Sequence, residues 1–322
     1  MARILVTGAA GFIGFHLCKA LADNHNHMVV GLDNFNDYYD TTLKTERAAI
    51  LYHTYDVPVI KADLRDLWDL NEAEVFKYNT FDLVIHLAAS VGVRHSYDNT
   101  MEYIENNVVG TQNLIDLCKS KRIGRVVYAS TSCVMAGNAL PWREDEPTGH
   151  QLNPYGYTKR TNECQFMTSG LDKTIGLRFF TVYGPYGRPD MALFQFARAA
   201  VNDESIDVYN YGNMKRDFTY VDDIVAGIKV IINRALTVND PQHEIYNIGR
   251  GQQVNLMDFI GEIEKNFGRE IKKNLVARHP ADTLETWSDT TKIQALGWKP
   301  TTSIPEGVAK FADWYKHYYG VN

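Results

Sequence analysis

The stretch RILVTGAAGFIGFHL, from Arg3 to Leu17, decides the fold of this chain. It begins with a short apolar run typical of a buried strand and continues with Gly8, Gly11 and Gly14 in G-x-x-G-x-x-G spacing. It ends in a segment whose apolar residues recur at helical spacing. In such a turn one glycine allows the tight bend, another lets the backbone approach a pyrophosphate, and the last permits close packing of helix and strand. The first amides of the helix attract the phosphates. The stretch therefore predicts a dinucleotide-binding α/β unit.

An acidic residue ends the next strand-like run, VVGLD. The carboxylate of Asp33 can accept hydrogen bonds from both hydroxyls of an adenosine ribose and would repel a 2′-phosphate, which favours NAD over NADP. The alternative is a turn aspartate without a ligand. Asp63, after a third strand-like run, is a candidate for binding the adenine amino group, but it could equally cap a helix over Leu64–Leu70.

Strand-like and amphipathic segments alternate through the first half of the chain, and this alternation predicts a doubly wound parallel sheet with helices on both faces, of the Rossmann type. Strands and helices are expected, in chain order, at Arg3–Thr7, Phe12–Ala22, Met28–Leu32, Val57–Ile60, Leu83–His86, Tyr103–Lys119 and Arg125–Ala129. The later segments expected are a helix at Thr219–Arg234, a strand at Gln242–Ile248 that returns to the sheet, and helices at Leu256–Phe267 and Pro305–Tyr318.

Two interleaved domains follow from this pattern. Residues 1–180, with about 215–248 returning to them, are expected to form the NAD-binding domain. Residues 181–214 and 249–322 are expected to form a smaller α/β substrate domain.

Composition excludes several classes of function. The 322 residues carry a net charge of −6 and no basic run, which argues against a nucleic-acid partner. No apolar stretch reaches the roughly 18 residues that a membrane span needs, and a strand-like run opens the chain where a signal peptide would stand. The four cysteines lie far apart, without a C-x-x-C pair, as in a reduced cytoplasmic protein. We therefore expect a cytoplasmic protein that holds no metal.

A tyrosine and a lysine four residues apart follow the hydroxyl-rich segment YASTS. Tyr155 and Lys159 would share one face of a helix. A neighbouring ammonium favours the phenolate, as would the positive ring of NAD⁺, and a phenolate can take a proton from a sugar hydroxyl while hydride leaves the same carbon. Thr131 or Ser132 could hydrogen-bond the developing oxygen. Taken alone, the spacing also fits an exposed pair; Tyr157 is a weaker candidate, because Thr161 follows it at that spacing.

Together these segments resemble the extended short-chain dehydrogenase/reductase superfamily, and within it the nucleotide-sugar 4-epimerases of the NAD-dependent epimerase/dehydratase family. The resemblance runs through TGAAGFIG, HLAA, GVRHS, NNVVGT, YASTS, GLRFFTVYGPYGRPDM, NMKRDFTYVDDI, YNIG and TTSIPEGVAKFADWY. The segment GLRFFTVYGPYGRPDM is the most specific and indicates an acidic sugar. The resemblance implies NAD as cofactor, a UDP-sugar substrate held by the second domain and a homodimer. It also implies C4 epimerisation of a UDP-hexuronic acid, from UDP-glucuronate to UDP-galacturonate through a transient 4-keto sugar.

The resemblance also implies roles for individual residues. Thr131, Tyr155 and Lys159 match the catalytic set, with Tyr155 as acid and base. Thr181, Arg188 and Ser132 match positions that hold the sugar carboxylate, and Arg216 matches the arginine on the UDP phosphates. Residues that would line NAD are Gly8, Gly11, Phe12, Ile13, Asp33, Asn34, Asp63, Leu64, Leu87, Ala88, Ala89, Asn107, Tyr155, Lys159 and Phe180.

Arginines suit such a substrate because their planar guanidinium groups fork onto carboxylates and phosphates. Each has a competing interpretation. Arg188 stands in a Gly/Pro-rich loop, where an arginine is often solvated. Arg216 could pair with Asp217, Asp222 or Asp223. Arg94 is either a further substrate-binding cation or half of a structural salt bridge.

Three departures from the family pattern bear on sugar selectivity. The usual serine-rich cluster reads Thr131-Ser132-Cys133, and the V-Y-G that follows it reads Val134-Met135-Ala136. The P-G-D near the nucleotide reads Pro280-Ala281-Asp282, which is tolerable unless that position needs a positive φ. Asp282 remains a candidate for substrate binding.

Four other functions occur on the same kind of fold, and particular residues bear on each of them. A 4,6-dehydratase would carry acids directly after the threonine, where Ser132-Cys133 stand, and a UDP-glucuronate decarboxylase commonly has an acid in the same cluster. Thr181 and Arg188 argue against a neutral-sugar epimerase for UDP-glucose or UDP-N-acetylglucosamine. An NAD-sensing regulator tends to lack the tyrosine or the lysine, and both are present here.

Overall fold

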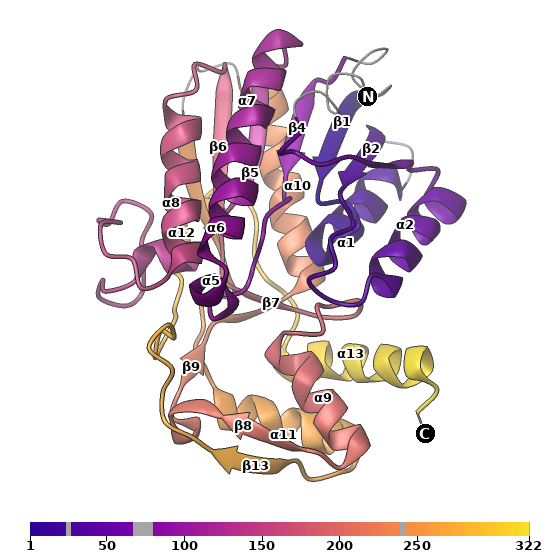
Figure 1. The fold of residues 1–322 in the computed structure, drawn as a ribbon, viewed down its shortest axis with the longest axis vertical. Coiled ribbons are helices and arrows are strands. Elements are labelled where there is room, and N and C mark those ends of the chain that lie inside the picture. The colour runs from indigo at the N-terminus through magenta and orange to yellow at the C-terminus, as the bar shows by residue number, and fades with distance from the viewer. Residues whose placement is uncertain (24–26, 67–79, 239–242, 322) are drawn as a thin grey trace.

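The computed structural model describes residues 1–23, 27–66, 80–238 and 243–321. Within these residues the central element is a parallel seven-stranded sheet in the order β11-β6-β5-β4-β1-β2-β3 (Figure 1). Its strands are β1 (Ala2–Thr7), β2 (His27–Asp33), β3 (Val59–Lys61), β4 (Leu83–His86), β5 (Arg125–Thr131), β6 (Lys173–Phe179) and β11 (His243–Ile248). The order starts at β1 and winds outward in both directions, which confirms the doubly wound fold.

Helices cover both faces of the sheet because successive strand residues point to opposite sides. On one face Ile4 and Val6 pack with the apolar residues of α1 (Phe12–Ala22) and α10 (Val221–Thr237). On the other face Leu5 packs with those of α7 (Gly110–Ser120) and α8 (Pro154–Met167). α2 (Thr42–Tyr55) lies against α1 and β3.

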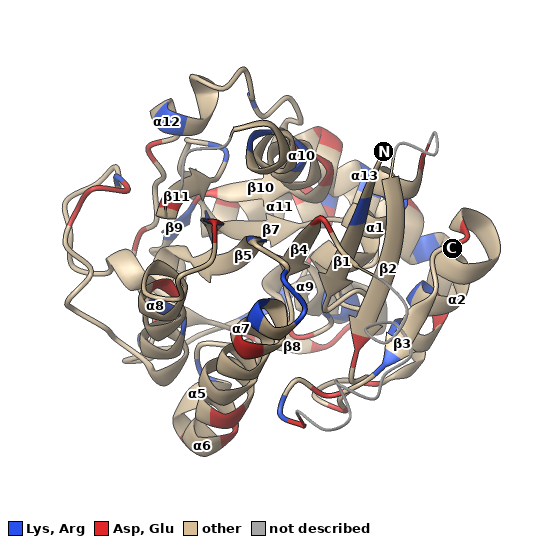
Figure 2. Cartoon of the chain, turned by 90° about the horizontal axis from the view of Figure 1, so that it is seen from above, with Lys and Arg blue, Asp and Glu red and all other residues tan. Residues whose placement is uncertain are grey.

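A smaller lobe lies beyond the carboxyl ends of the strands (Figure 1). Its helices are α9 (Ala192–Asn202), α11 (Leu256–Phe267) and α13 (Ile304–Tyr319), and a short α12 (Thr291–Gln294) packs beside β11. Its short strands pair as β10 (Phe218–Tyr220) with β7 (Thr181–Tyr183), β12 (Val254–Asn255) with β9 (Lys215–Arg216), and β13 (Lys272–Leu275) with β8 (Ser205–Val208). Seen from above in Figure 2, charged residues lie mainly on the helices and loops around the sheet.

Two expected helices are wrong in their limits. The segment expected as one helix at Tyr103–Lys119 starts at the last residue of α6 (Thr100–Tyr103), which itself follows α5 (His95–Asp98). It continues as a π-helical segment, η2 (Ile104–Val109), and ends in α7. The wider π turn coincides with Asn107, whose side chain is held by Ser90 and Thr158. The helix expected at Thr219–Arg234 begins two residues later because Thr219 pairs with Val182 in a strand. The strand expected at Val57–Ile60 begins at Val59.

No helix among the described residues combines the length and the apolar character that crossing a bilayer demands.

Candidate active site

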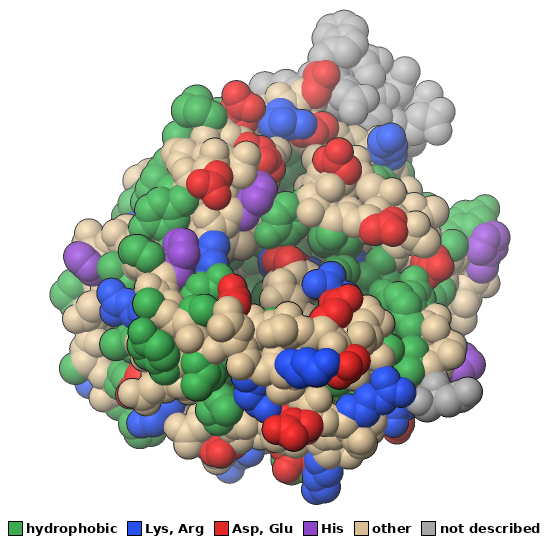
Figure 3. All heavy atoms as spheres, turned by 60° about the horizontal axis from the view of Figure 1, so that its bottom comes forward, with side chains coloured by type: hydrophobic (Ala, Val, Ile, Leu, Met, Phe, Trp, Pro, Cys, Tyr) green, Lys and Arg blue, Asp and Glu red, His purple; other side chains and the backbone are tan. Residues whose placement is uncertain are grey.

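A cavity of about 750 Å³ lies between the carboxyl ends of the sheet strands and the smaller lobe. On the face drawn in Figure 3 the surface is hollowed near its centre, with acidic and basic side chains around the hollow. All but one of the site residues expected from the sequence line this cavity: Gly8, Gly11, Phe12, Ile13, Asp33, Asn34, Asp63, Leu64, Leu87, Ala88, Ala89, Arg94, Thr131, Ser132, Tyr155, Lys159, Phe180, Thr181, Arg188, Arg216 and Asp282. The exception is Asn107.

The glycine turn lies at one end of the cavity. Gly8 has a φ of +73°, and a β-carbon there would lie 2.8 Å from the amide nitrogen of Ala88, two residues after β4. A β-carbon on Gly14 would overlap the carbonyl oxygen of Gly8. Gly11 is the N-cap of α1 and places no side chain on its first amides, so these donors can bind an anion. This arrangement fits the pyrophosphate of a dinucleotide.

Asp33 is buried beside this turn. Its Oδ2 accepts a hydrogen bond from the Ala10 amide at 3.1 Å and its Oδ1 one from the Phe35 amide at 2.9 Å. Burial raises the pKa of Asp33, and these amides together with Lys44 and Arg47 oppose the rise. Each oxygen keeps a lone pair for a further donor. The carboxyl is therefore held in a defined orientation on the cavity wall, as binding of ribose hydroxyls requires.

Asp63 accepts hydrogen bonds from Arg65 and from the Asn34 side chain. Burial would raise its pKa, but these hydrogen bonds and the Arg65 charge lower the pKa to about 2. The helix that Asp63 might have capped is not seen at residues 64–66, which form a turn; residues 67–70 lie outside the described part of the chain.

Asn107 lies behind the cavity wall rather than on it. Its Oδ1 accepts from the Ser90 amide at 2.7 Å, and its Nδ2 donates to the Ser90 carbonyl at 3.0 Å and to the Thr158 hydroxyl at 3.1 Å. The side chain thus holds Ser90, which lines the cavity, against α8.

Tyr155 and Lys159 stand one turn apart in α8, which Asn153 caps by accepting a hydrogen bond from the Gly156 amide at 2.7 Å. Burial raises the pKa of Tyr155 to about 12; Cys133 acts in the same direction, and Arg188 and a hydrogen bond with Thr131 oppose it. Burial therefore outweighs the opposing effects of Arg188 and of the Thr131 hydrogen bond on this phenol. Burial also lowers the pKa of Lys159 to about 8, against the opposing charge of Glu163.

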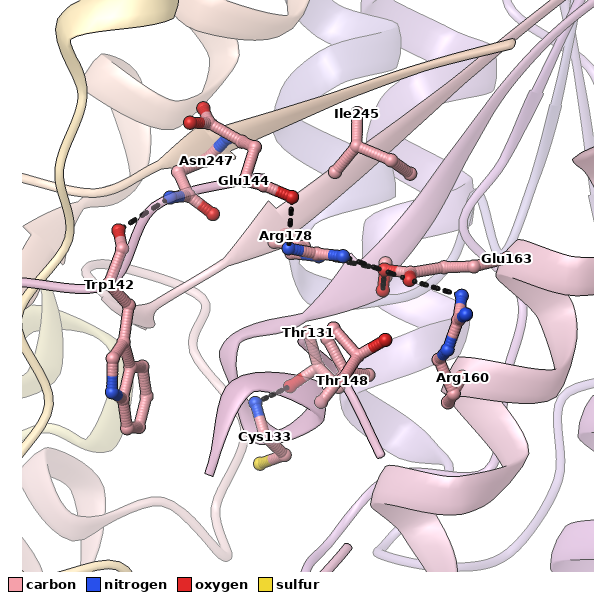
Figure 4. A network of polar contacts seen from close by, with 12 residues as sticks. Thr131, Cys133, Trp142, Glu144, Thr148, Arg160, Glu163, Arg178, Ile245 and Asn247 are labelled. Atoms are coloured by element: carbon pink, nitrogen blue, oxygen red, sulfur yellow. Dashed lines mark hydrogen bonds and ion pairs between the residues drawn. The ribbon is translucent and has the colours of Figure 1, made fainter. Parts of the chain in front are cut away.

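An ionic network surrounds Glu163, one turn after Lys159 in α8; Figure 4 shows Glu163 between Arg178 and Arg160. Glu163 accepts hydrogen bonds from Arg178 at 2.9 and 3.1 Å, from Ser130 at 2.7 Å and from Arg160 at 3.2 Å. Burial acts to raise its pKa, but Arg178, Ser130 and Arg160 lower it overall. Glu163 is therefore a fixed anion one turn beyond Lys159, and it favours the ammonium form of that lysine.

The three candidate substrate-binding arginines differ in their partners. Arg188 donates to both oxygens of Asp190, at 3.0 and 2.5 Å. Arg94 forms a bidentate pair with Asp282, at 3.3 and 2.7 Å, and its guanidinium lies 3.5 Å from the ring centre of Tyr209, so the salt-bridge interpretation describes its contacts.

Arg216 donates to two carbonyl oxygens, those of Lys215 and Leu284. It forms no ion pair with the three nearby aspartates, which have other partners: Asp217 binds Ser288, Asp222 lies near His16, and Asp223 binds Thr301 and Thr302.

The structure accommodates two of the departures from the family pattern. Met135 is buried in a small cluster with Trp142 and Phe180 and does not line the cavity. Ala281 is buried and has no positive φ, so its methyl group is tolerated. Cys133, in contrast, lines the cavity, and its amide donates to the Thr131 hydroxyl at 3.3 Å.

Several cavity residues were not found from the sequence. Lys44 and Tyr38 come from the segment after β2, and Tyr209 and Gln195 come from the smaller lobe. No motif marks them, because only the packing of α2 and of the lobe brings them to the site.

Comparison with known proteins agrees with this geometry. The chain is 39% identical to a probable UDP-glucuronate 4-epimerase of Rhizobium meliloti, covering 98% of each chain. It is 36% identical to a UDP-glucuronate 4-epimerase of Thermodesulfobacterium geofontis, covering 98% of this chain and 97% of that one. Among solved structures it is similar to the UDP-glucuronic acid 4-epimerase of Bacillus cereus in complex with UDP-glucuronic acid and NAD, with a TM-score of 0.89, 35% identity and coverage of 98% and 100%.

Residues 4–249 match the model of the NAD-dependent epimerase/dehydratase family, and this match, together with the relatives and the glycine turn at the end of β1, shows that the chain belongs to that family.

Proposed function

We propose that this protein is an NAD-dependent isomerase that interconverts UDP-glucuronate and UDP-galacturonate by inversion at C4. The observation that carries the proposal is that Tyr155 and Lys159 share one cavity with the glycine turn and with Arg188. The residues proposed for hydride chemistry and a cation that could bind an acidic sugar thus line the same cavity. Two relatives and a structural neighbour are named for the same reaction.

The reaction needs a group that removes the proton of the 4-hydroxyl and later returns it. Tyr155 is proposed to perform both steps. Thr131, which hydrogen-bonds the Tyr155 hydroxyl, is proposed to bind the same sugar oxygen. Lys159 favours the phenolate through its charge. When bound, NAD⁺ would supply the acceptor for the hydride that leaves C4 of the sugar. It would also supply a cationic ring that, like Lys159, favours the phenolate. The 4-keto sugar turns about its diphosphate linkage and presents its other face, so the same groups complete the inversion.

The substrate carboxylate is a hazard in this scheme, because a β-keto acid loses CO₂ readily. We propose that Arg188, Thr181 and Ser132 hold the carboxylate in an orientation that disfavours cleavage of the C–C bond. All three line the cavity with Tyr155. Arg216, also on the wall, is proposed to bind the UDP phosphates, and Arg94 and Asp282 are proposed to contact the nucleotide as a pair.

Incubation of the purified protein with UDP-glucuronate tests the reaction. We expect UDP-galacturonate as the sole new nucleotide sugar, with no net change in NADH absorbance, because the hydride returns to the same carbon. Chromatography of the nucleotide sugars and CO₂ trapping provide the measurement. Formation of a UDP-pentose with CO₂ would identify a decarboxylase instead. Turnover of UDP-glucose in preference to the acid would identify a neutral-sugar epimerase, and binding of NAD without any turnover would leave only a sensor.

With NAD⁺ bound, its positive ring and Lys159 together are proposed to lower the pKa of Tyr155 below about 8, the pKa of Lys159. The rate should then fall as the pH rises through about 8, since Lys159 loses its proton near that pH and no longer favours the phenolate. A pH profile of kcat/KM measures this alkaline limb. Because Glu163 supports the ammonium form, Glu163→Gln should move the limb to lower pH. A limb that stays in place or moves to higher pH in this variant would contradict the role given to Lys159.

The domain division is part of the proposal. Residues 1–180 with about 215–248 would bind NAD, and residues 181–214 with 249–322 would bind the UDP-sugar. The pairing of β11 with β6 and the packing of α10 on the sheet support the return of the middle segment to the first domain.

We further propose a cytoplasmic homodimer. All four cysteines are free thiols, as in a reducing compartment. Met101 in α6, Val109 in η2 and Met167 at the end of α8 are 63%, 46% and 55% exposed, on elements that pack together on one side of the sheet. Such exposed apolar side chains suit a self-complementary interface.

Charged substitutions on these helices test the dimer. Met101→Glu combined with Val109→Glu should yield a monomer, because two like charges would be buried at the interface. Sedimentation velocity measures the mass. Met257→Glu, on α11 in the other lobe, serves as control and should leave the dimer intact. A double variant that sediments like the unchanged protein would contradict this interface.

A further inference from the structure

The loop that follows β7 is fastened to the NAD-binding lobe by three successive carbonyl groups. His16 Nε2, in α1, donates to the Pro185 carbonyl at 2.9 Å. Arg47 Nη2, in α2, donates to the carbonyls of Tyr186 and Gly187 at 2.6 and 3.1 Å. The next residue of the loop is Arg188. The contacts with α1, which follows the glycine turn, and with α2 therefore fix the backbone position from which the Arg188 side chain extends.

The other edge of the Arg47 guanidinium reaches the glycine turn itself. Its Nη1 donates to the Ala10 carbonyl at 2.9 Å and to the Tyr39 hydroxyl at 2.8 Å, and the Ala10 amide in turn donates to Asp33. Arg47 is fully buried, and within the described part of the chain it forms no ion pair with a carboxylate. Its rigid fork spans two backbone segments, which the single ammonium of a lysine cannot do.

The loop needs such support because its backbone is strained. Tyr186 has a φ of +54°, in the left-handed region that bulky residues rarely adopt. A residue of this kind persists only where its surroundings hold it. The ring of Tyr186 packs on Phe15 and Trp314, at centroid distances of 4.9 Å each, while Arg47 holds its carbonyl.

The loop ends at a second fastening, on the cavity side. Asp190 accepts both hydrogen bonds of Arg188, and the Tyr38 hydroxyl donates to Asp190 at 3.2 Å. Arg188 is thus held from both sides, by Arg47 through the loop backbone and by Asp190 through its own side chain. A shift of the loop would move the guanidinium relative to Tyr155 across the cavity.

From this chain of contacts we propose that Arg47 is a positioning residue that couples the dinucleotide-binding turn to the grip of Arg188 on the carboxylate of the sugar. This inference rests on the proposed function. Arg47 touches no substrate in this scheme. Arg47 thereby makes the affinity for the acidic sugar depend on the conformation of the glycine turn.

The test is a double-mutant cycle measured by calorimetry on NAD-loaded protein, with Tyr155→Phe in every variant so that the ligand is not consumed. UDP-glucuronate and UDP are the titrants, and UDP lacks the group that Arg188 is proposed to bind. Arg47→Met should weaken UDP-glucuronate about five- to tenfold and UDP by less than about twofold. With Arg188→Met already present, Arg47→Met should change the affinity for UDP-glucuronate by less than about twofold.

Two further variants guard the result against misfolding. Arg47→Lys keeps the charge without the fork and should show a smaller loss, again confined to UDP-glucuronate. Arg234→Met removes two hydrogen bonds to Glu244, outside the cavity, and should alter neither affinity.

The outcomes separate the inference from the function beneath it. If the Arg47 variants lose affinity equally for UDP-glucuronate and UDP, the coupling is overturned. It is also overturned if Arg47→Met weakens UDP-glucuronate as much in the Arg188→Met background as it does alone. If Arg188→Met itself weakens UDP and UDP-glucuronate equally, the proposed role of Arg188 fails, and the coupling fails with it.

Discussion

Replacing Tyr155 by phenylalanine should reduce the turnover of UDP-glucuronate about a thousandfold, within the range that general acid–base groups contribute. The phenol is the only titratable group proposed to exchange a proton with the 4-hydroxyl, and phenylalanine keeps its ring while removing that proton site. The ring contact with Tyr103, at a centroid distance of 6.3 Å, can be kept, so binding of NAD and UDP-glucuronate should change little.

Stopped assays of UDP-galacturonate formation measure the turnover, and calorimetry measures the binding. Tyr157→Phe is a matched control two residues along the same helix, since Tyr157 does not line the cavity and should be dispensable. Turnover within about tenfold of the unchanged protein in Tyr155→Phe would remove the tyrosine from the mechanism.

Replacing Gly14 by alanine should destabilise the protein by about 3 kcal/mol, at the upper end of overpacking costs, and should abolish stable NAD binding. The added methyl group would overlap the carbonyl oxygen of Gly8, which is backbone and cannot rotate away. The turn and α1 would have to move apart, and the amides that fit a pyrophosphate would move with them. Thermal unfolding and the NAD content of the purified protein measure both effects.

Gly261→Ala is the control for this substitution, because it makes the same change inside a helix where nothing lies within 4 Å of the added carbon. Alanine there should stabilise the protein by up to about 1 kcal/mol through its higher helix propensity. Normal NAD content and unchanged stability in Gly14→Ala would contradict the close packing of the turn.

Local sequence patterns predicted the limits of an element correctly where those limits depend only on the element's own residues. The helices Phe12–Ala22 and Leu256–Phe267 and the strand Leu83–His86 have the limits that periodicity predicts. The glycine turn is equally local, because strand, turn and helix follow one another within a few residues. The single helix expected at Tyr103–Lys119 is wrong because its π turn depends on Asn107 binding Ser90 and Thr158. Neither contact is visible in a helical pattern.

Contacts between distant residues decided how the site is arranged. Arg94 could have bound a substrate alone, but Asp282, 188 residues away, pairs with it. The pKa of Tyr155 depends on how deeply the phenol is buried, which the spacing to Lys159 does not show. Arg47 carries no motif; its importance comes from lying between the glycine turn and the Arg188 loop.

Residues close together in the chain were enough to predict the cofactor-binding turn, the alternation of strands and helices in the doubly wound sheet, and the reacting tyrosine and lysine. The pairing of Arg94 with Asp282, the burial of Tyr155 and the position of Arg47 between the turn and the loop of Arg188 depend instead on tertiary packing. The contacts of Arg47 and Arg94 join segments more than a hundred residues apart, where side-chain geometry and desolvation, rather than local spacing, set the energies.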